Sequence, residues 1–285
     1  MTDMLKLPAP TWFVGCGNMG GAVLDGWRLA GLDLAQVTVI RPSGNVVDGA
    51  RVVTSAADAG PPPRLALLAF KPQKLDEIAP DLRQRLSSRT IVVSMLAGVE
   101  AESLRQRFPG AGAIVRAMPN LPVAIRRGVT GLFTADAEEG MRDEVGNLFS
   151  ALGFAMWMND EARLAALGSV AGAGPAYVAR FIAALTKAGI KRGLSEDIAA
   201  TVARETVLGT AWMAATTGED MESIARRVAS PKGTTEAGLA VLDGEAALDD
   251  LIAATINAAF ARGLQLAEEA KASGSSSLAE APTVH

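Results

Sequence analysis

The sequence has almost no histidine and almost no cysteine. Its 285 residues include one of each, His285 and Cys16. Because the single histidine is the last residue, a histidine catalytic triad, a histidine general acid and a histidine zinc site are excluded unless that terminus folds back into a site. We therefore expect no metal. One cysteine cannot form an intrachain disulfide and fits a reducing compartment, so we expect a cytoplasmic protein.

Positive charge is not in excess either. The chain carries 27 Lys and Arg against 31 Asp and Glu, a net charge of -4. Proteins that bind the phosphate backbone usually have a basic surplus, so we expect no nucleic-acid partner.

Long apolar runs are scarce. Residues 1–10 contain Asp3 and two prolines rather than the basic and then apolar pattern of a signal peptide. The uncharged stretch 164–179 is broken by glycines and Pro175, and it is shorter than the roughly 20 residues that a membrane helix needs. We expect neither a leader nor a membrane partner.

The two halves of the sequence differ in their hydrophobic pattern, which fits about two domains at roughly 150 residues each. In the first half, short apolar runs alternate with amphipathic helical stretches, a pattern typical of a doubly wound α/β parallel sheet covered on both faces. We predict this domain over residues 1–158. Its predicted strands are residues 11–14, 37–40, 51–53, 65–70, 91–94, 113–118, 129–133 and 154–158.

The second half is predicted to be an all-helical domain over residues 159–272, followed by a disordered Ser-rich tail over 273–285. Its predicted helices are residues 175–188, 196–216, 221–228, 236–242 and 245–272. Their abundant Ala and Gly leave little apolar bulk, so we expect a second copy of the chain to complete the core, in a homodimer or a larger homo-oligomer. A self-sufficient bundle is the alternative.

A glycine-rich turn follows the first predicted strand and opens a helix that extends to about Ala30. In such a turn the first glycine permits the tight bend, the second lets the backbone approach a pyrophosphate, and the third allows close helix packing. The helix N-terminus then offers free N–H groups to the phosphates. Glycine patterns are common, but the place of this one in a β-helix-β unit predicts a Rossmann-type dinucleotide site. Its residues are Gly15, Cys16, Gly17, Asn18, Met19 and Gly20.

The end of the second predicted strand bears on cofactor choice. A site for NAD usually has Asp or Glu there to bond the ribose hydroxyls. This sequence has Arg41 and Ser43, with no acid before Asp48. A cation and a hydroxyl suit an adenosine 2'-phosphate, so we predict NADP(H) over NAD(H). A solvent-exposed arginine without a cofactor role is the alternative.

Three more loops leave the carboxyl ends of predicted strands, where ligands bind in open α/β sheets. They are residues 70–73, 94–98 and 118–122. Their prolines and glycine are equally typical of plain turns, so by themselves they leave a functional role open.

With these residues in view, the chain resembles the pyrroline-5-carboxylate reductases over nearly its whole length. The resemblance rests on the Gly-Asn-Met-Gly turn and on four further motifs, of which the last two are the most specific. These are Lys71-Pro72-Gln73, Arg116-Ala117-Met118-Pro119-Asn120, Gly172-Ala173-Gly174-Pro175-Ala176-Tyr177 and Ser230-Pro231-Lys232-Gly233-Thr234-Thr235. The resemblance implies an NADPH-binding domain, a helical dimerisation domain and a cleft between them with walls from both subunits. It also implies reduction of the cyclic imine 1-pyrroline-5-carboxylate to proline.

The resemblance further implies roles for individual residues. Thr235 matches the family threonine near the ring nitrogen and is the candidate catalytic residue. Substrate binding is implied for Ser230, Lys232, Gly233, Thr234 and Thr235. Cofactor contacts are implied at the glycine turn and at Ala69, Phe70, Lys71, Pro72, Met95, Leu96, Ala97 and Asn120.

The residues themselves support a substrate loop over 230–235. The segment precedes a predicted helix, so its N–H groups and hydroxyls meet a helix N-terminus, a place that binds a carboxylate. The alternative is that Thr234 or Thr235 simply caps that helix. The missing histidine is harmless for this reaction, because an imine nitrogen is basic enough to arrive protonated.

The chain departs from the family at several positions. Ala165, Gly168, Ala171 and Ala173 stand where the family usually has polar residues, and Lys232 stands where it usually has glycine. The departures leave two other functions open. One is a β-hydroxyacid dehydrogenase, which would need an acid–base group such as Lys187 or Lys191. The other is a catalytically silent NADPH-binding protein.

Overall fold

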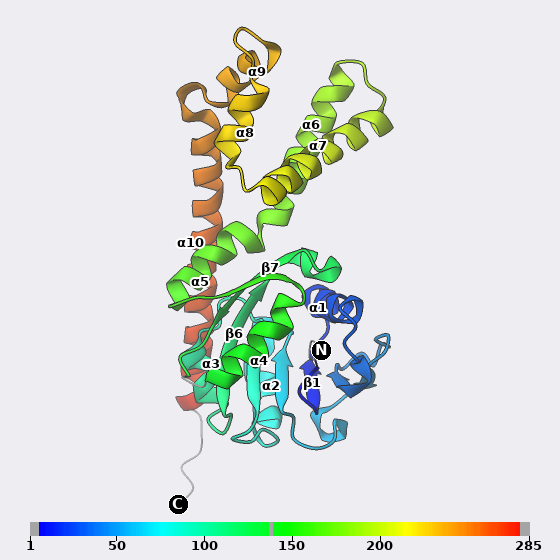
Figure 1. Cartoon of the computed structure of the whole chain (residues 1–285). Coiled ribbons are helices and arrows are strands. Elements are labelled where there is room, and N and C mark those ends of the chain that lie inside the picture. Colours follow the sequence, from blue (N-terminus) through cyan, green and yellow to red (C-terminus); the bar gives the residue numbers. More distant parts are fainter. Residues whose placement is uncertain (1–5, 137–138, 280–285) are drawn as a thin grey trace, which may run out of the picture. The chain divides into compact units, whose positions relative to one another are not determined.

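A computed structural model describes residues 6–136 and 139–279, and these residues form two compact units (Figure 1). The first unit contains the described residues up to Ala173 and those from Ala259 onward, and the second contains Gly174–Ala258. By its contacts the first unit therefore extends past residue 158, where we placed the domain boundary, and it also takes in the end of the last helix.

The first unit is built on an eight-stranded sheet. The strand order is β3-β2-β1-β4-β5-β6-β7-β8, and the first six of these strands are parallel to one another. This is the order of dinucleotide-binding doubly wound folds, which confirms the predicted fold class. The strands are β1 (Thr11–Val14), β2 (Val37–Ile40), β3 (Arg51–Val53), β4 (Leu65–Leu68), β5 (Ile91–Ser94), β6 (Ala113–Pro119), β7 (Gly128–Phe133) and β8 (Gly153–Trp157).

The direction of the chain reverses at β7, where we expected a wholly parallel sheet. β7 pairs antiparallel with β6, and β8 is parallel to β7. A parallel neighbour needs a crossover of about a dozen residues or more. The segment between β6 and β7 holds only a short 3-10 helix, η4 (Leu121–Ile125), so the chain can only turn back.

Helices cover both faces of the sheet. Side chains of α1 (Asn18–Leu29) and α4 (Glu139–Ser150) pack on one face, and those of α2 (Leu75–Arg83) and α3 (Ala101–Arg107) pack on the other. On the first face Trp27 donates a hydrogen bond from Nε1 to the Leu148 carbonyl at 2.9 Å. Burial on two faces explains why β1, β2, β4 and β5 are buried at every residue rather than at alternate ones.

Two helical segments complete the first unit. α5 (Glu161–Leu167) runs into a π-helical turn, η5 (Gly168–Gly172). The last helix, α10 (Ala247–Ala279), contributes its part from Ala259 onward. We expected a disordered tail from residue 273, but the helix continues to Ala279, since extending a helix costs far less than starting one. Residues 280–285, the rest of the predicted tail, lie outside the described residues.

The second unit is helical, as predicted. It contains α6 (Gly174–Lys191), α7 (Glu196–Thr217), α8 (Met221–Val228) and α9 (Thr234–Leu242), followed by the start of α10. α6 and α7 lie side by side in Figure 1, and a Cβ on Gly189 of α6 would be 3.3 Å from the Ala199 Cβ of α7. α10 begins at Ala247 rather than at residue 245 because Glu245 has a positive φ of 52°.

Candidate functional site

The glycine turn between β1 and α1 has the shape of a phosphate site. A Cβ on Gly15, where φ is +80°, would lie 2.7 Å from the Ala69 carbonyl oxygen at the end of β4. A Cβ on Gly20 would lie 3.0 Å from the Phe13 ring, whereas one on Gly17 would meet nothing within 4 Å. Gly17 is the N-cap of α1, with no side-chain cap and no acid in the first turn. Free N–H groups therefore face open space, which fits a pyrophosphate.

Arg41 lies near this turn, at the end of β2. Burial raises the pKa of the Cys16 thiol in the turn. Arg41 is close enough for its positive charge to lower this pKa, and the charge of Asp25 raises it. The guanidinium of Arg41 has no hydrogen bond or ion pair among the described residues, and Ser43 is exposed. A cation beside the turn is thus free to bind an anion, as a 2'-phosphate requires.

The other predicted cofactor residues follow β4 and β5. Phe70, Pro72 and Met95 are half-buried, and Lys71 and Ala97 are exposed. Together with the turn and Arg41, they line the carboxyl ends of four strands that are adjacent in the sheet, β2, β1, β4 and β5. Strands about 4.8 Å apart make this a row of about 14 Å, along which an extended dinucleotide can lie.

Outside the glycine turn, two predicted cofactor contacts, Leu96 and Asn120, are more enclosed than the others. Leu96 is 3% exposed and packs in the core beside α3, although it also contributes to the wall of the cavity described below. Asn120 is buried and uses both ends of its amide within the protein. Its Oδ1 accepts a hydrogen bond from the Val129 N–H at 2.8 Å, and its Nδ2 donates to the Ala171 carbonyl at 3.0 Å. The side chain of Asn120 therefore ties β7 to η5.

A cavity of about 550 Å³ lies in the first unit, next to the segment that follows β5 and to the carboxyl-terminal residues of β6. This volume is in the range of small-molecule sites. Its lining includes Met19, Met95, Leu96 and Ala97, together with residues of α5, η5 and the middle of α10. Most of its wall is apolar, and its charged residues are Glu100, Arg116 and Glu161.

The buried Arg116 and the half-buried Glu161 form an ion pair in the wall of this cavity. Nη1 of Arg116 lies 2.6 Å from Oε1 of Glu161, and the Arg116 side chain is 8% exposed. The same Glu161 oxygen accepts a hydrogen bond from the Ala101 N–H at 2.9 Å, at the start of α3. We did not predict either residue as part of the site. The available signal was a charge inside the apolar run 113–118, since charged residues are rarely buried unless paired.

The predicted substrate loop lies in the second unit, before α9. Gly233 is the N-cap of this helix and no side chain caps it, so the alternative that a threonine caps it is wrong. Thr234 and Thr235 lie in the first turn, and their hydroxyls have no hydrogen bond to any described residue. Lys232 has a φ of 59°, and its N–H donates to Glu236 Oε2 at 2.7 Å. The loop thus presents a helix N-terminus with two free hydroxyls, a kind of place that binds a carboxylate, and the Glu236 carboxylate of the first turn already binds one of its N–H groups.

Comparisons with known proteins agree with these features. A family model described as pyrroline-5-carboxylate reductase dimerisation matches residues 161–266, and one described as NADP oxidoreductase coenzyme F420-dependent matches residues 12–98. The chain is 34% identical over 267 residues to the pyrroline-5-carboxylate reductase of Pseudomonas aeruginosa, an alignment that covers 90% of this chain and 96% of the relative. The chain belongs to the pyrroline-5-carboxylate reductase family.

Solved structures of the family share the fold. That of the Coxiella burnetii enzyme is 28% identical and matches with a TM-score of 0.82, over 91% of this chain and 99% of that one. The Plasmodium falciparum enzyme, solved with NADP bound, has the same TM-score at 22% identity, over 91% of this chain and 98% of that one. The resemblance inferred from the motifs is therefore confirmed.

Three of the predicted departures from the family pattern lie at the cavity. Ala165, Gly168 and Ala173 line it, while Ala171 contributes the carbonyl that Asn120 binds. A Cβ on Gly168 would lie 2.1 Å from Met118 Sδ, so this position has no room for a larger residue unless Met118 moves. Because Ala165, Gly168 and Ala173 have no polar side chain, they add to the apolar part of the cavity wall.

No group of three or more His, Cys, Asp or Glu residues among the described residues is placed to hold a metal ion. None of the helices in the described part of the chain combines the length and the hydropathy needed to cross a membrane.

Proposed function

We propose that this chain reduces 1-pyrroline-5-carboxylate to L-proline with NADPH, the last step of proline synthesis. The observation that carries the proposal is family membership along nine-tenths of the chain, with a relative named for this activity. The free phosphate turn in the first unit and the uncapped helix N-terminus in the second support it independently.

The proposed chemistry makes modest demands on the side chains. The imine nitrogen arrives protonated, so its carbon is already electrophilic and no strong protein acid is required. The bound nicotinamide supplies the hydride. The protein must hold the ring in place and exclude water, which together account for most of the catalysis in such a reaction.

The residues of the loop 230–235 bind the substrate in this proposal. The N–H groups at the start of α9 and the hydroxyl of Thr234 bind the carboxylate, with Ser230, Gly233 and Lys232 completing the loop. Thr235 is the proposed catalytic residue, because its free hydroxyl can orient the ring nitrogen. The apolar wall of the 550 Å³ cavity keeps water from the nicotinamide end of the cofactor.

The cofactor is NADPH in preference to NADH. Arg41, with Ser43 nearby, binds the 2'-phosphate. Between the end of β2 and Asp48 there is no acidic residue that could bond a ribose hydroxyl instead. The pyrophosphate is bound at Gly17 and the first turn of α1, where the N–H groups are free and a Cβ would meet nothing.

The chain acts as a homodimer or a larger assembly of dimers. A dimerisation model covers residues 161–266, and α6 and α7 carry large apolar side chains that are exposed in the single chain. The single cysteine supports a cytoplasmic location.

A spectrophotometric assay tests the function. NADPH absorbance should fall when 1-pyrroline-5-carboxylate is added, and 3-hydroxy acids with NADP⁺ should give no turnover. Turnover with the hydroxy acids alone would establish a dehydrogenase, and NADPH binding without any turnover would establish a silent protein. Thr235→Ala should lower kcat at least tenfold and leave the Kd for NADPH unchanged, since one oriented polar group is worth that much in a transition state.

Thr216→Ala is the matched control for this substitution. The Thr216 hydroxyl bonds to the Trp212 carbonyl within α7, at 2.8 Å. Its loss should leave kcat unchanged. An undiminished kcat in Thr235→Ala removes Thr235 from the site.

A further inference from the structure

Arg116 is a buried arginine whose guanidinium uses only part of its hydrogen-bonding capacity within the described residues. Its guanidinium carries five N–H donors, and Glu161 is its one hydrogen-bonding partner among the described residues. Within the described part of the chain, Trp12 Nε1 is the only side-chain nitrogen or oxygen that is sealed from solvent without a partner. The remaining N–H groups of Arg116 therefore reach open space, and the space that this residue lines is the 550 Å³ cavity.

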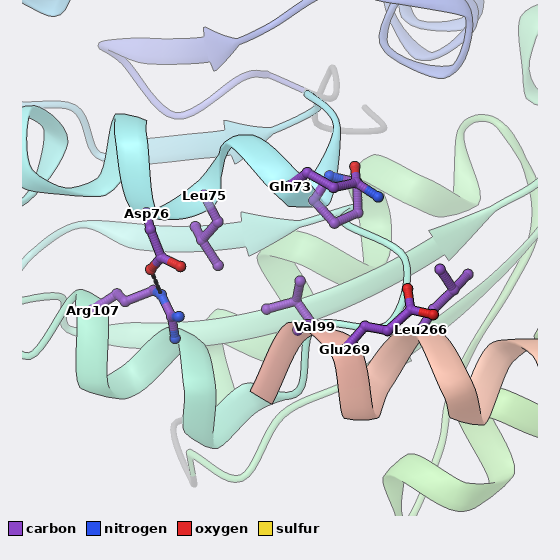
Figure 2. Close-up of a pocket in the computed structure, with 9 residues that line it drawn as sticks. Gln73, Leu75, Asp76, Val99, Arg107, Leu266 and Glu269 are labelled. Carbon is purple, nitrogen blue, oxygen red and sulfur yellow. Dashed lines mark hydrogen bonds and ion pairs between the residues drawn. The ribbon is translucent and has the colours of Figure 1, made fainter. Parts of the chain in front are cut away.

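Arg107 shows how a similarly buried arginine is held elsewhere in the first unit. It is 11% exposed and lines a smaller cavity of about 210 Å³, drawn in Figure 2. Its Nε donates to Asp76 Oδ1 at 2.7 Å, and its Nη1 donates to the carbonyl of Ser103 at 3.0 Å and to the Ser103 Oγ at 2.6 Å. Two similarly buried arginines thus differ in how many donors the protein leaves free.

The position of the larger cavity indicates which part of a dinucleotide reaches it. Arg41 is at β2, on one side of the glycine turn, and the cavity is at β5 and β6, on the other side. Met19 and Met95, both predicted cofactor contacts, line the cavity. With the adenosine 2'-phosphate at Arg41, the nicotinamide end lies at the cavity.

The charges in the wall narrow the kind of group that Arg116 can bind. Glu161 neutralises the charge of the Arg116 guanidinium. A pair without net charge offers little attraction to an anion, whereas its remaining N–H groups can still donate to a neutral oxygen acceptor. The carboxamide of a nicotinamide ring carries such an oxygen.

We propose that Arg116 is a cofactor-binding residue, whose free guanidinium N–H groups donate to the carboxamide oxygen of the nicotinamide. Glu161 is its positioning residue. It holds the guanidinium with the same oxygen that binds the Ala101 N–H, and so links the ion pair to the loop that carries Met95. The inference rests on the proposed use of NADPH.

Calorimetry with two ligands tests the inference without turnover. One ligand is NADPH and the other is 2'-phospho-ADP-ribose, which lacks the nicotinamide. Arg116→Met should raise the Kd for NADPH about tenfold or more, because a hydrogen bond from a charged donor is lost, and should leave the Kd for the fragment unchanged. Arg116→Lys keeps the positive charge but loses the planar set of guanidinium donors, so it should raise the Kd for NADPH by an intermediate factor.

Arg107→Met is the matched control, with an equally buried ion pair lost away from the proposed contact. It should lower the melting temperature and leave both Kd values unchanged. If Arg116→Met leaves the NADPH Kd unchanged, or raises both Kd values by the same factor, the inference is overturned.

Glu161→Gln decides the matter if Arg116→Met does not fold. It keeps an oxygen for the Ala101 N–H but loses the charge that holds Arg116, so it should raise only the NADPH Kd, by a smaller factor. Equal effects on both ligands would again contradict the inference. An unaltered protein that shows no reduction of the imine, while these variants separate the two ligands, would refute the proposed function alone.

Discussion

At the scale of single residues, the free charge of Arg41 governs the proposed cofactor selectivity. The two cofactors differ by one phosphate on the adenosine ribose. Arg41 is a cation near the glycine turn with no hydrogen bond or ion pair among the described residues, so nothing in the described chain competes with a phosphate for it. Selectivity should therefore follow the sign of the charge at this position.

Arg41→Asp should lower the ratio of kcat/KM for NADPH to that for NADH at least tenfold. A hydrogen bond to a charged group contributes about 1.5–3 kcal/mol, and about 1.4 kcal/mol is a factor of ten. The new carboxylate can also bond a ribose hydroxyl. Steady-state kinetics with both cofactors measure the ratio. The control is Arg89→Asp. Arg89 is exposed and precedes the amino end of β5, away from the carboxyl ends of the strands, so this substitution should not alter the ratio. The same ratio in Arg41→Asp as in the unaltered protein would show that Arg41 does not bind the phosphate.

Residues whose role follows from the backbone were predictable from the sequence, and residues whose role follows from distant neighbours were not. The spacing of Gly15, Gly17 and Gly20 was enough to predict a bend, an open position and a packed position, and the structure has all three. The amide of Asn120 is bound by groups 9 and 51 residues away, and Glu161 reaches Arg116 across 45 residues. No local pattern contains those distances.

At the scale of elements, the start of α8 depends on one carboxylate. Asp220 is the N-cap, with Oδ1 accepting from the Ser223 N–H at 2.9 Å and Oδ2 accepting from the Ser223 hydroxyl at 2.8 Å. The backbone hydrogen bond, and then the side-chain one, lower the pKa of Asp220 below its ordinary 3.8. A lowered pKa in the folded protein means that ionised Asp220 stabilises the fold above about pH 4. That contribution is lost as the pH falls through the lowered value.

Asp220→Ala should accordingly reduce the melting temperature at neutral pH, because the first turn of α8 loses its cap. The difference in melting temperature between the unaltered protein and the variant should shrink as the pH falls below 3.8. Thermal scans monitored by circular dichroism from pH 7 to pH 2.5 measure it. Asp81→Ala, which removes an exposed aspartate of α2 that makes no side-chain hydrogen bond to described residues, should give no such trend. A difference that stays constant with pH would rule out the cap as its source.

Most elements could be read from hydrophobic periodicity, but their directions could not. All eight predicted strands form, and the two-sided burial that makes them apolar also makes them easy to find. The reversal at β7 depends on the length of the link after β6, and periodicity contains no information on direction. The π-helical turn at η5 was also missed, since its Ala- and Gly-rich sequence resembles that of an ordinary helix.

At the scale of the whole molecule, the second unit has too few buried side chains to be complete alone. Only Ala199, Ala203 and Ile224 are buried among residues 174–258. Large exposed apolar patches on a soluble chain mark interaction sites, and a small core needs support from a partner. The exposed large apolar residues of α6 and α7 are Val178, Phe181, Leu185, Ile190, Ile198, Val202, Leu208 and Trp212. The scarcity of bulk was visible in the sequence, whereas the placement of the apolar side chains became visible only in the structure.

Leu208→Glu should convert the proposed dimer to a monomer. Leu208 is 57% exposed in the single chain, so a charge there is harmless to the fold of one chain but must be buried when α7 packs against a partner. Sedimentation velocity over a range of concentrations should show at least a hundredfold weaker association, since burying an unpaired charge costs several kcal/mol. Leu29→Glu places the same charge at a leucine that is 58% exposed at the end of α1, in the first unit, and should leave the dimer intact. If Leu208→Glu still sediments as a dimer with unchanged affinity, this face of α7 is not the subunit interface, and the exposed apolar side chains of α6 become the next surface to test.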